Sequence, residues 1–122
     1  RRAIKLPVSA PFHCDMMQPA AEAMAAALTH ADMKDSAVPV FCNVAAAPES
    51  NAEALRANLV TQVTGRVRWR ETLLAAQAAE VTAFVEIGTG KVLSGLAKRT
   101  LEDAAIANLD GADDLDSVLA HL

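Results

Sequence analysis

The sequence has 122 residues, of which 52% are hydrophobic and 21% are charged, a composition that is typical of one modest globular domain and excludes a disordered chain. The net charge is −4 and aromatic residues make up only 3%, so the chain lacks the basic stripe and stacking rings of a nucleic-acid binder. No apolar run approaches the ~18 residues of a membrane span, and no signal peptide is recognisable. Two cysteines, Cys14 and Cys42, do not make a disulfide framework, so we expect free thiols in a cytoplasmic protein.

The first third of the sequence predicts a strand, a helix and a second strand. Residues 3–8 alternate weakly between apolar and polar and predict the first strand. A helix follows to about residue 28 and has two possible starts, because Asp15 and Gln18 form a D-x-x-Q capping pattern while the next residue is a first-turn proline. Residues 38–44 (VPVFCNV) favour a short strand whose proline confines it to a strand start or a sheet edge. The helix is expected to bury a stripe made of Met17, Ala20, Ala21, Met24 and Leu28.

The rest of the sequence alternates helices with strands. Gly65 is expected to end the first of these helices in a left-handed conformation. Because strands that alternate with helices form right-handed βαβ units, we predict an α/β fold with a mostly parallel sheet. Helices are predicted over residues 52–63, 67–79, 91–101 and 113–122, and strands over residues 82–87 and 104–109.

His13 occupies the loop between the first predicted strand and the first predicted helix. Loops of this kind often carry the chemistry of α/β proteins, so His13 is a candidate general base. The alternative is a structural histidine, since the sequence contains no G-x-S-x-G elbow that would supply a serine nucleophile.

Gln62 combines a polar side chain on the inner face of its predicted helix with a carbonyl near the helix end. It falls between Leu55 and Leu59 around the helix, so its side chain points towards the protein. If the helix ends at Gly65, the Gln62 carbonyl lacks an intrahelical donor and lies at the negative pole of the helix dipole. It could accept an imidazole N–H in the place usually taken by an aspartate, whereas the alternative is that Gln62 only caps or packs.

Two other patterns do not match binding motifs. Residues 88–91 (GTGK) lack the further glycine and the hydroxyl residue of a phosphate loop and depart from G-x-G-x-x-G, so we predict a tight strand-to-helix turn. His13, Cys14 and Cys42 do not have the spacing of a metal site, because the C-x-x-C pair of structural zinc is missing. We therefore expect neither a metal nor a cofactor.

Four blocks of the sequence resemble the bacterial malonyl-CoA:acyl carrier protein transacylases. The blocks are VSAPFHC followed by M-x-P-A, then VPVFCNV, LVTQVTGRVRW and EIGTGKVLSGLAKR, and the resemblance as a whole covers about residues 3–109. The resemblance implies the C-terminal part of an α/β-hydrolase-like acyltransferase core with a mostly parallel sheet, entered from the last strand of a ferredoxin-like subdomain. Residues 1–8 would end that small subdomain and form the return strand, and residues 9–122 would belong to the core. The strand-like opening without a starting Met also favours part of a longer polypeptide.

The resemblance implies an enzyme and assigns roles to particular residues. The family transfers a malonyl group from malonyl-CoA to the phosphopantetheine thiol of acyl carrier protein in fatty-acid biosynthesis, by a ping-pong mechanism through an acyl-serine. The family's histidine base, in its S-x-P-x-H-C block, maps to His13. The glutamine whose main-chain carbonyl orients that base maps to Gln62. The nucleophilic serine, the oxyanion-hole glutamine and the arginine that binds the malonyl carboxylate would lie upstream, in the preceding part of the same polypeptide.

Phe12 maps to a position that tracks substrate choice in the related acyltransferase domains of polyketide synthases. A phenylalanine there accompanies malonyl, because a ring beside the α-carbon leaves no room for a methyl branch. One methyl group in an apolar pocket is worth only ~1–3 kcal/mol, so Phe12 predicts a preference and not an absolute filter. The alternative is that Phe12 only packs.

Two alternatives to a free-standing fatty-acid enzyme fit the sequence. An acyltransferase domain of a polyketide synthase would carry the same blocks, although GTGKVLSGLAKR and the short tail fit the discrete bacterial form better. A non-catalytic interaction domain would keep the fold without the chemistry, and an upstream GHSxGE elbow would distinguish an enzyme from it. Neither a nucleic acid nor a membrane is expected as a partner.

Overall fold

The structure is a computed structural model that describes residues 8 and 10–120, and the chain divides into two compact units. The first unit comprises Arg1–Val44 and Glu49–Val67, and the second comprises Ala45–Pro48 and Arg68–Leu122. The strand predicted over residues 3–8, and with it the expected end of a ferredoxin-like subdomain, lies outside the described residues except for residue 8.

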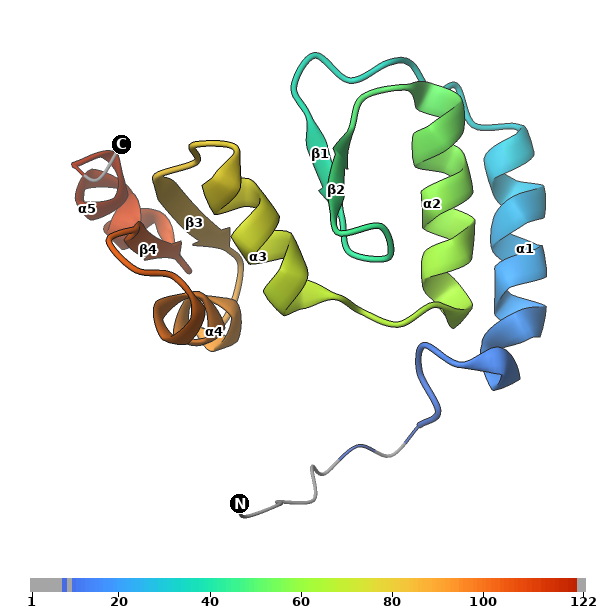
Figure 1. Cartoon of the computed structure of the whole chain (residues 1–122), viewed down its shortest axis with the longest axis horizontal. Helices are drawn as coiled ribbons and strands as arrows, with labels where there is room; N and C mark the ends of the chain where they lie inside the picture. Colours follow the sequence, from blue (N-terminus) through green and yellow to red (C-terminus); the bar gives the residue numbers. More distant parts are fainter. Residues whose placement is uncertain (1–7, 9, 121–122) are drawn as a thin grey trace. The chain divides into compact units, whose positions relative to one another are not determined.

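Two helices packed against each other dominate the first unit (Figure 1). Both predicted starts of the first helix are present: the 3₁₀ turn η1 covers Asp15–Met17, and α1 continues over Gln18–Thr29 with a proline in its first turn. The predicted capping pattern is wrong, because Asp15 lies inside the 3₁₀ turn and neither start has a side-chain cap. Only Ala21 of the predicted stripe is buried, since α1 packs mainly against η1 and α2 (Ala52–Thr64).

The start of α2 is anchored by side chains, which explains why this helix was predicted within one residue. Asn51 caps it by accepting a hydrogen bond from the Ala54 N–H at 3.1 Å. The Asp35 carboxylate accepts a second one from the Ala52 N–H at 2.8 Å and so ties the preceding connection to the helix. These two hydrogen bonds satisfy N–H groups of the first turn of α2 that have no partner within the helix.

A small two-stranded sheet precedes α2 and consists of β1 (Val40–Cys42) and β2 (Ala47–Glu49). β1 is shorter than the predicted strand over residues 38–44. β2 was not predicted, because its sequence APE contains alanine and proline, which have low strand propensity.

A parallel pair of strands forms the centre of the second unit. The two strands pair in register from Ala83↔Ala105 to Ile87↔Leu109, and a helix connects them as in a βαβ unit. The predicted α/β class with a parallel sheet is confirmed, and the predicted helices and strands agree with the structure within two residues, except that the last helix ends at Leu119 and not at residue 122. The elements of this unit are α3 (Trp69–Ala78), β3 (Ala83–Ile87), α4 (Val92–Thr100), β4 (Ala105–Leu109), η2 (Ala112–Asp114) and α5 (Leu115–Leu119).

The core of the second unit lies where α3 and α4 cover this strand pair. Leu73, Ala97 and Leu101 are buried there, and their neighbours complete the cluster. The partly buried residues packed around them are Trp69, Leu74, Phe84, Ala104 and Ile106. Burial of apolar surface at this junction holds the βαβ unit together.

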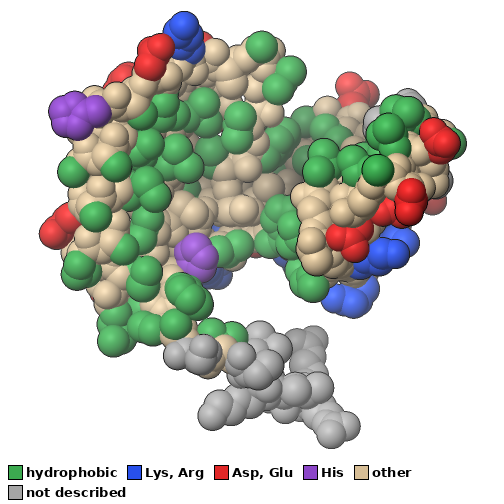
Figure 2. All heavy atoms as spheres, turned by 180° about the vertical axis from the view of Figure 1, so that it is seen from behind, with side chains coloured by type: hydrophobic (Ala, Val, Ile, Leu, Met, Phe, Trp, Pro, Cys, Tyr) green, Lys and Arg blue, Asp and Glu red, His purple; other side chains and the backbone are tan. Residues whose placement is uncertain are grey.

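Many large apolar side chains are nevertheless exposed, as the spread of hydrophobic surface in Figure 2 shows. Exposed apolar surface of this extent is typical of faces that contact other polypeptide segments. No helix within residues 10–120 combines the length and hydropathy that a bilayer span requires. The exposed residues include Val8, Phe12, Met16, Met24, Val38, Val40, Leu59, Val67, Ile87, Val92, Leu93, Leu115 and Leu119.

Candidate active site

The imidazole of His13 meets the main-chain carbonyl of Gln62 within the first unit. The His13 Nδ1 nitrogen lies 2.8 Å from the Gln62 oxygen, although the two residues are 49 positions apart. A carbonyl oxygen can only accept, so we assign the ring proton to Nδ1, which leaves a lone pair on Nε2. The contact expected from the sequence is confirmed, and it leaves the outer ring nitrogen able to take up a proton.

The end of α2 makes this carbonyl available. The Gly65 N–H donates to the Thr61 carbonyl at 2.8 Å, and α2 ends at Thr64. Gly65 itself has extended backbone, with φ −78° and ψ 150°, so the helix does not continue. The Gln62 oxygen thus belongs to the last turn, where the carbonyl ends of the peptide dipoles make a partial negative charge.

The left-handed conformation predicted for Gly65 is wrong, and a different constraint favours glycine there. A Cβ atom at this position would lie 2.7 Å from the Thr61 carbonyl oxygen and 2.8 Å from Val44 Cγ2. The first of these atoms belongs to the backbone and cannot simply rotate away. Glycine therefore allows the close approach that ends the helix, and left-handed freedom is not needed.

The side chain of Gln62 has a separate role from its carbonyl. Its Nε2 nitrogen donates to the Gly65 carbonyl at 3.2 Å in a half-buried position. The side chain therefore caps the end of α2, as the alternative interpretation of this residue proposed. Capping by the side chain and presentation of the carbonyl to His13 occur together.

The backbone of His13 is unusual, because its φ of +56° lies in the left-handed region. Histidine is among the residues that tolerate this region, yet holding it costs about 1–3 kcal/mol. Hydrogen bonds on both sides fix the turn: the Phe12 N–H donates to Ala10 at 3.0 Å, and the Met17 N–H donates to Cys14 at 2.9 Å. Ala46, Glu80 and Asp103 have similar φ values, so it is the contact with the Gln62 carbonyl that sets His13 apart.

Phe12 lies next to His13 and is 62% exposed, so its ring is not part of the described core. The ring is available to contact a bound molecule or another segment. Its influence on substrate choice stays a prediction.

An open pocket of about 380 Å³ lies beside Gln62 in the same unit. Apolar side chains of β1 and α2 form most of its wall, and Asn43 and Asn58 add polar groups. The Asn43 Oδ1 atom is buried and has no hydrogen-bond partner among the described residues. A buried acceptor normally has a donor, so this pocket is suited to receive a polar group.

The described residues do not assemble a metal site. Within residues 8 and 10–120, no three His, Cys, Asp or Glu side chains gather closely enough to hold an ion. Cys14 and Cys42 are both free and half-buried.

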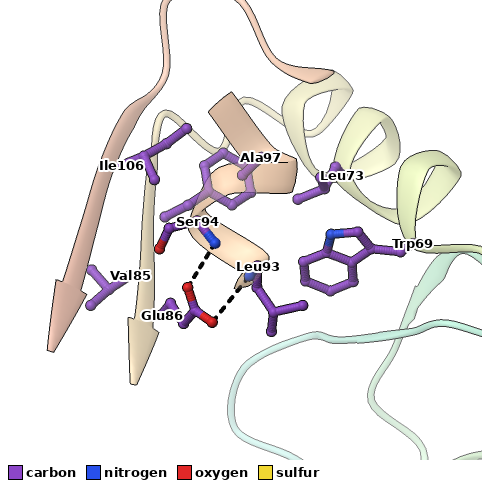
Figure 3. A pocket seen from close by; sticks show the side chains of 9 residues that line it. Trp69, Leu73, Val85, Glu86, Leu93, Ser94, Ala97 and Ile106 are labelled. Atoms are coloured by element: carbon purple, nitrogen blue, oxygen red, sulfur yellow. Dashed lines mark hydrogen bonds between the residues drawn. The ribbon is translucent and has the colours of Figure 1, made fainter. Parts of the chain in front are cut away.

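A second polar cluster, in the second unit, lies at the start of α4, just after the GTGK turn. The Glu86 carboxylate accepts hydrogen bonds from the N–H groups of Leu93 at 3.1 Å and Ser94 at 2.7 Å (Figure 3). The pKa of Glu86 is lowered, first by the Ser94 hydroxyl, then by the Ser94 N–H and, more weakly, the Leu93 N–H. The start of α4 is therefore occupied by the chain's own anion, a role that the sequence patterns did not reveal.

The turn before α4 needs its two glycines for conformational reasons. Gly88 and Gly90 have φ values of 133° and 97°, a region that side chains rarely adopt. The Asn108 amide donates to the Gly90 carbonyl at 2.8 Å and holds the turn against β4. The predicted tight strand-to-helix turn is confirmed.

Comparisons with known proteins find similarity to one group of enzymes. The malonyl CoA-acyl carrier protein transacylase of Synechocystis is 42% identical over 118 residues, which are 97% of this chain and 40% of that protein. The acyl-carrier-protein-S-malonyltransferase of Bartonella henselae is 47% identical with a TM-score of 0.90, covering 98% of this chain and 38% of that one. A malonyl transacylase in complex with a type II polyketide acyl carrier protein is 37% identical, with a TM-score of 0.89 over 100% of this chain and 40% of its own.

No protein-family model matches the sequence. The chain spans about two-fifths of the length of the relatives that it matches, at 40% of the Synechocystis protein and 38% of the Bartonella protein. The similarity therefore concerns one part of a larger enzyme in each case.

Proposed function

We propose that this chain, which is homologous over nearly its whole length to part of the malonyl-CoA:acyl carrier protein transacylases, supplies the general base of a malonyl-transfer site. His13 would be the base and the Gln62 carbonyl would orient it. The 2.8 Å contact between His13 Nδ1 and that carbonyl is the observation that carries the proposal. The nucleophilic serine would come from polypeptide outside residues 1–122, since the sequence has no G-x-S-x-G elbow.

In the first half-reaction, the serine hydroxyl attacks the thioester carbonyl of malonyl-CoA and gives its proton to His13 Nε2. The carbon–sulfur bond then breaks, the CoA thiolate receives the proton from the imidazolium, and an acyl-serine remains. In the second half-reaction, the phosphopantetheine thiol of acyl carrier protein gives its proton to Nε2 and attacks the acyl-serine. The serine oxygen takes the proton back as it leaves, so His13 ends in its starting state.

The carbonyl of Gln62 is suited to this cycle because its hydrogen bond is kept throughout. Nδ1 retains its proton both in the neutral ring and in the imidazolium, and the carbonyl accepts that proton in each state. The partial negative charge of the helix end favours the positive ring that forms in the transition state. This acceptor thus performs the orienting part of a triad without a carboxylate.

The substrate and the setting belong to the same proposal. Phe12, exposed beside His13, would favour malonyl over branched acyl groups, and acyl carrier protein would be the acceptor in fatty-acid biosynthesis in the cytoplasm. The similarity to a transacylase that is bound to a polyketide carrier protein supports polyketide synthesis as the second candidate pathway.

A chimaera tests the proposal. This chain would replace the corresponding 38% of the Bartonella henselae acyltransferase, and malonyl transfer from CoA to acyl carrier protein would be measured. The chimaera should be active, and His13→Ala should lower its rate by about 10²–10⁴-fold, the usual contribution of a general base. The exposed residue His30, at the end of α1, provides the matched control His30→Ala, which should keep the rate. This chain alone should show no transfer, and a full rate for His13→Ala would remove His13 from the mechanism.

A further inference from the structure

We propose that Cys14 is a positioning residue whose thiol holds His13 in its left-handed conformation. The role rests on the proposed function of His13 as a base, but the contact itself is a property of the turn. Cys14 follows His13 directly and is half-buried, with a free thiol.

The thiol closes the turn through a hydrogen bond that is separate from the Gln62 contact. Cys14 Sγ donates to the Pro11 carbonyl at 3.2 Å, so the bond spans His13 and the residue before it. Pro11 has a fixed φ and is a rigid end for this bridge. Cys14 itself is extended, with φ −148° and ψ 173°, and provides the chain's entry into η1. The bridge thus links the rigid start of the turn to the first residue before the 3₁₀ helix.

The left-handed backbone of His13 makes this bridge relevant to the ring. A residue at φ +56° stays there only where its surroundings restrict it, because relaxed backbone angles are lower in energy. The direction of the imidazole follows from that backbone conformation. Without the thiol bridge the turn can relax, and Nδ1 would face the Gln62 carbonyl for a smaller fraction of the time. The outer nitrogen would then meet the nucleophile less often, while contacts that bind the substrate would be unchanged.

The other cysteine offers a matched control. Cys42 is also free and half-buried in the first unit, and its Sγ lies 3.7 Å from the Val40 carbonyl. It lies in β1 and not in the turn that carries His13. A general effect of losing a half-buried thiol would appear equally in the Cys42 variant.

The kinetic test uses the chimaera with Cys14→Ala, Cys14→Ser and Cys42→Ala. Cys14→Ala should lower kcat by about 2- to 10-fold with an unchanged KM, the range expected for one hydrogen bond. Cys14→Ser keeps a donor and should retain most of the rate, and Cys42→Ala should equal the parent. A parental kcat for Cys14→Ala, or equal losses for the alanine and serine variants, would overturn the proposal. If Cys14→Ala does not fold, Cys14→Val removes the donor at similar volume and takes its place.

A spectroscopic readout separates this proposal from the proposed function. Nitrogen NMR of His13 in the neutral ring should show Nδ1 as the protonated atom in the parent and in Cys14→Ser. In Cys14→Ala the two ring nitrogens should move towards averaged shifts, because the Gln62 contact no longer selects one tautomer. Unchanged shifts in Cys14→Ala would refute the positioning role. The parent chimaera could be inactive while Cys14→Ala still moves the two ring nitrogens towards averaged shifts. The proposed function would then fail, and the role of Cys14 would stand.

Discussion

The side-chain amide of Gln62 donates to the Gly65 carbonyl at 3.2 Å, so one residue caps the end of α2 while its own carbonyl binds His13. The two roles can be tested separately, because every residue presents a main-chain carbonyl and only some can cap. Gln62→Ala should keep the transfer rate of the chimaera within about threefold and lower its stability by about 0.5–1.5 kcal/mol, the net value of one hydrogen bond.

The measurement is thermal unfolding together with the transfer rate. Gln77 provides a matched control, because its Nε2 likewise donates from a helix to a main-chain carbonyl, that of Glu102, at 2.8 Å. Gln77→Ala should cost similar stability and leave the rate unchanged. A loss of activity for Gln62→Ala as large as for His13→Ala would mean that the side chain takes part in catalysis.

Gly65→Ala should harm both stability and rate, because its Cβ would lie 2.7 Å from the Thr61 oxygen. Relief requires movement of the last turn of α2, at a cost of about 1–3 kcal/mol, and that movement displaces the Gln62 carbonyl. Val44→Ala in the same chain should restore only part of the loss, since it removes the 2.8 Å contact and leaves the backbone contact.

Gly95→Ala provides the comparison within a helix. Its added Cβ would be 3.9 Å from the nearest group, on Arg99, so it should be tolerated and should raise stability by about 0.5–1 kcal/mol. Equal melting temperatures and rates for the parent and Gly65→Ala would show that the last turn adjusts freely.

Much of the fold could be predicted from local patterns. The apolar run of β3 and the glycines at residues 88 and 90 predict a buried strand and a tight turn; the structure has the strand and the turn, but β3 is only half-buried and Ile87 is exposed. β2 could not be predicted, since Ala47, Pro48 and Glu49 carry no strand pattern and only pairing with β1 defines the strand. Its existence depends on tertiary contact and not on propensity.

The candidate site was predicted in outline but not in its backbone. The orphan carbonyl of Gln62 follows from where α2 ends, and the resemblance to the family indicated His13 as its partner. The left-handed φ of His13 has no local signature, because it is restricted by a hydrogen bond to a residue 49 positions away and by the turn around it. A glycine after a helix usually has a positive φ, and this rule predicted the wrong φ for Gly65. The close contact with Val44, which favours glycine here, is not visible in the sequence.

The backbone strain at His13 predicts that glycine is better than alanine at this position. Both His13→Gly and His13→Ala lose the contact with Gln62, so the difference between them isolates the backbone. At φ +56° glycine has no steric cost, and His13→Gly should be more stable than His13→Ala by roughly 1 kcal/mol in thermal or denaturant unfolding. Ala57 in α2 should show the opposite sign, with Ala57→Gly less stable than the parent. A more stable alanine variant at residue 13 would show that the turn relaxes when the ring is removed.

Phe12 should affect the choice of acyl group if its ring lies beside the substrate. Phe12→Ala in the chimaera should raise the rate with methylmalonyl-CoA relative to malonyl-CoA by about tenfold or more. Tenfold is about the smallest discrimination that one methyl group gives in an apolar pocket. Met16 is a nearby apolar residue with 74% exposure, and Met16→Ala should leave this ratio unchanged. An unchanged ratio for Phe12→Ala would assign Phe12 to packing.

Glu86 should make the second unit sensitive to acid. Hydrogen bonds from Ser94 and Leu93 lower the pKa of Glu86 below its ordinary value of 4.5. At a pH between the folded pKa and 4.5, the unfolded chain therefore binds more protons than the folded one. The stability that this carboxylate contributes is therefore present above its ordinary pKa and is lost as the pH falls through the lowered folded pKa.

Glu86→Gln should lower the melting temperature at neutral pH and flatten its fall towards acid, as measured by circular dichroism across an acid series. Glu102→Gln, at an exposed site of the same unit, should follow the parent curve. If the melting temperatures of the parent and of Glu86→Gln fall in parallel towards acid, the charge of Glu86 does not contribute. The N–H groups of α4 would then be stabilised as well by an amide oxygen as by the carboxylate.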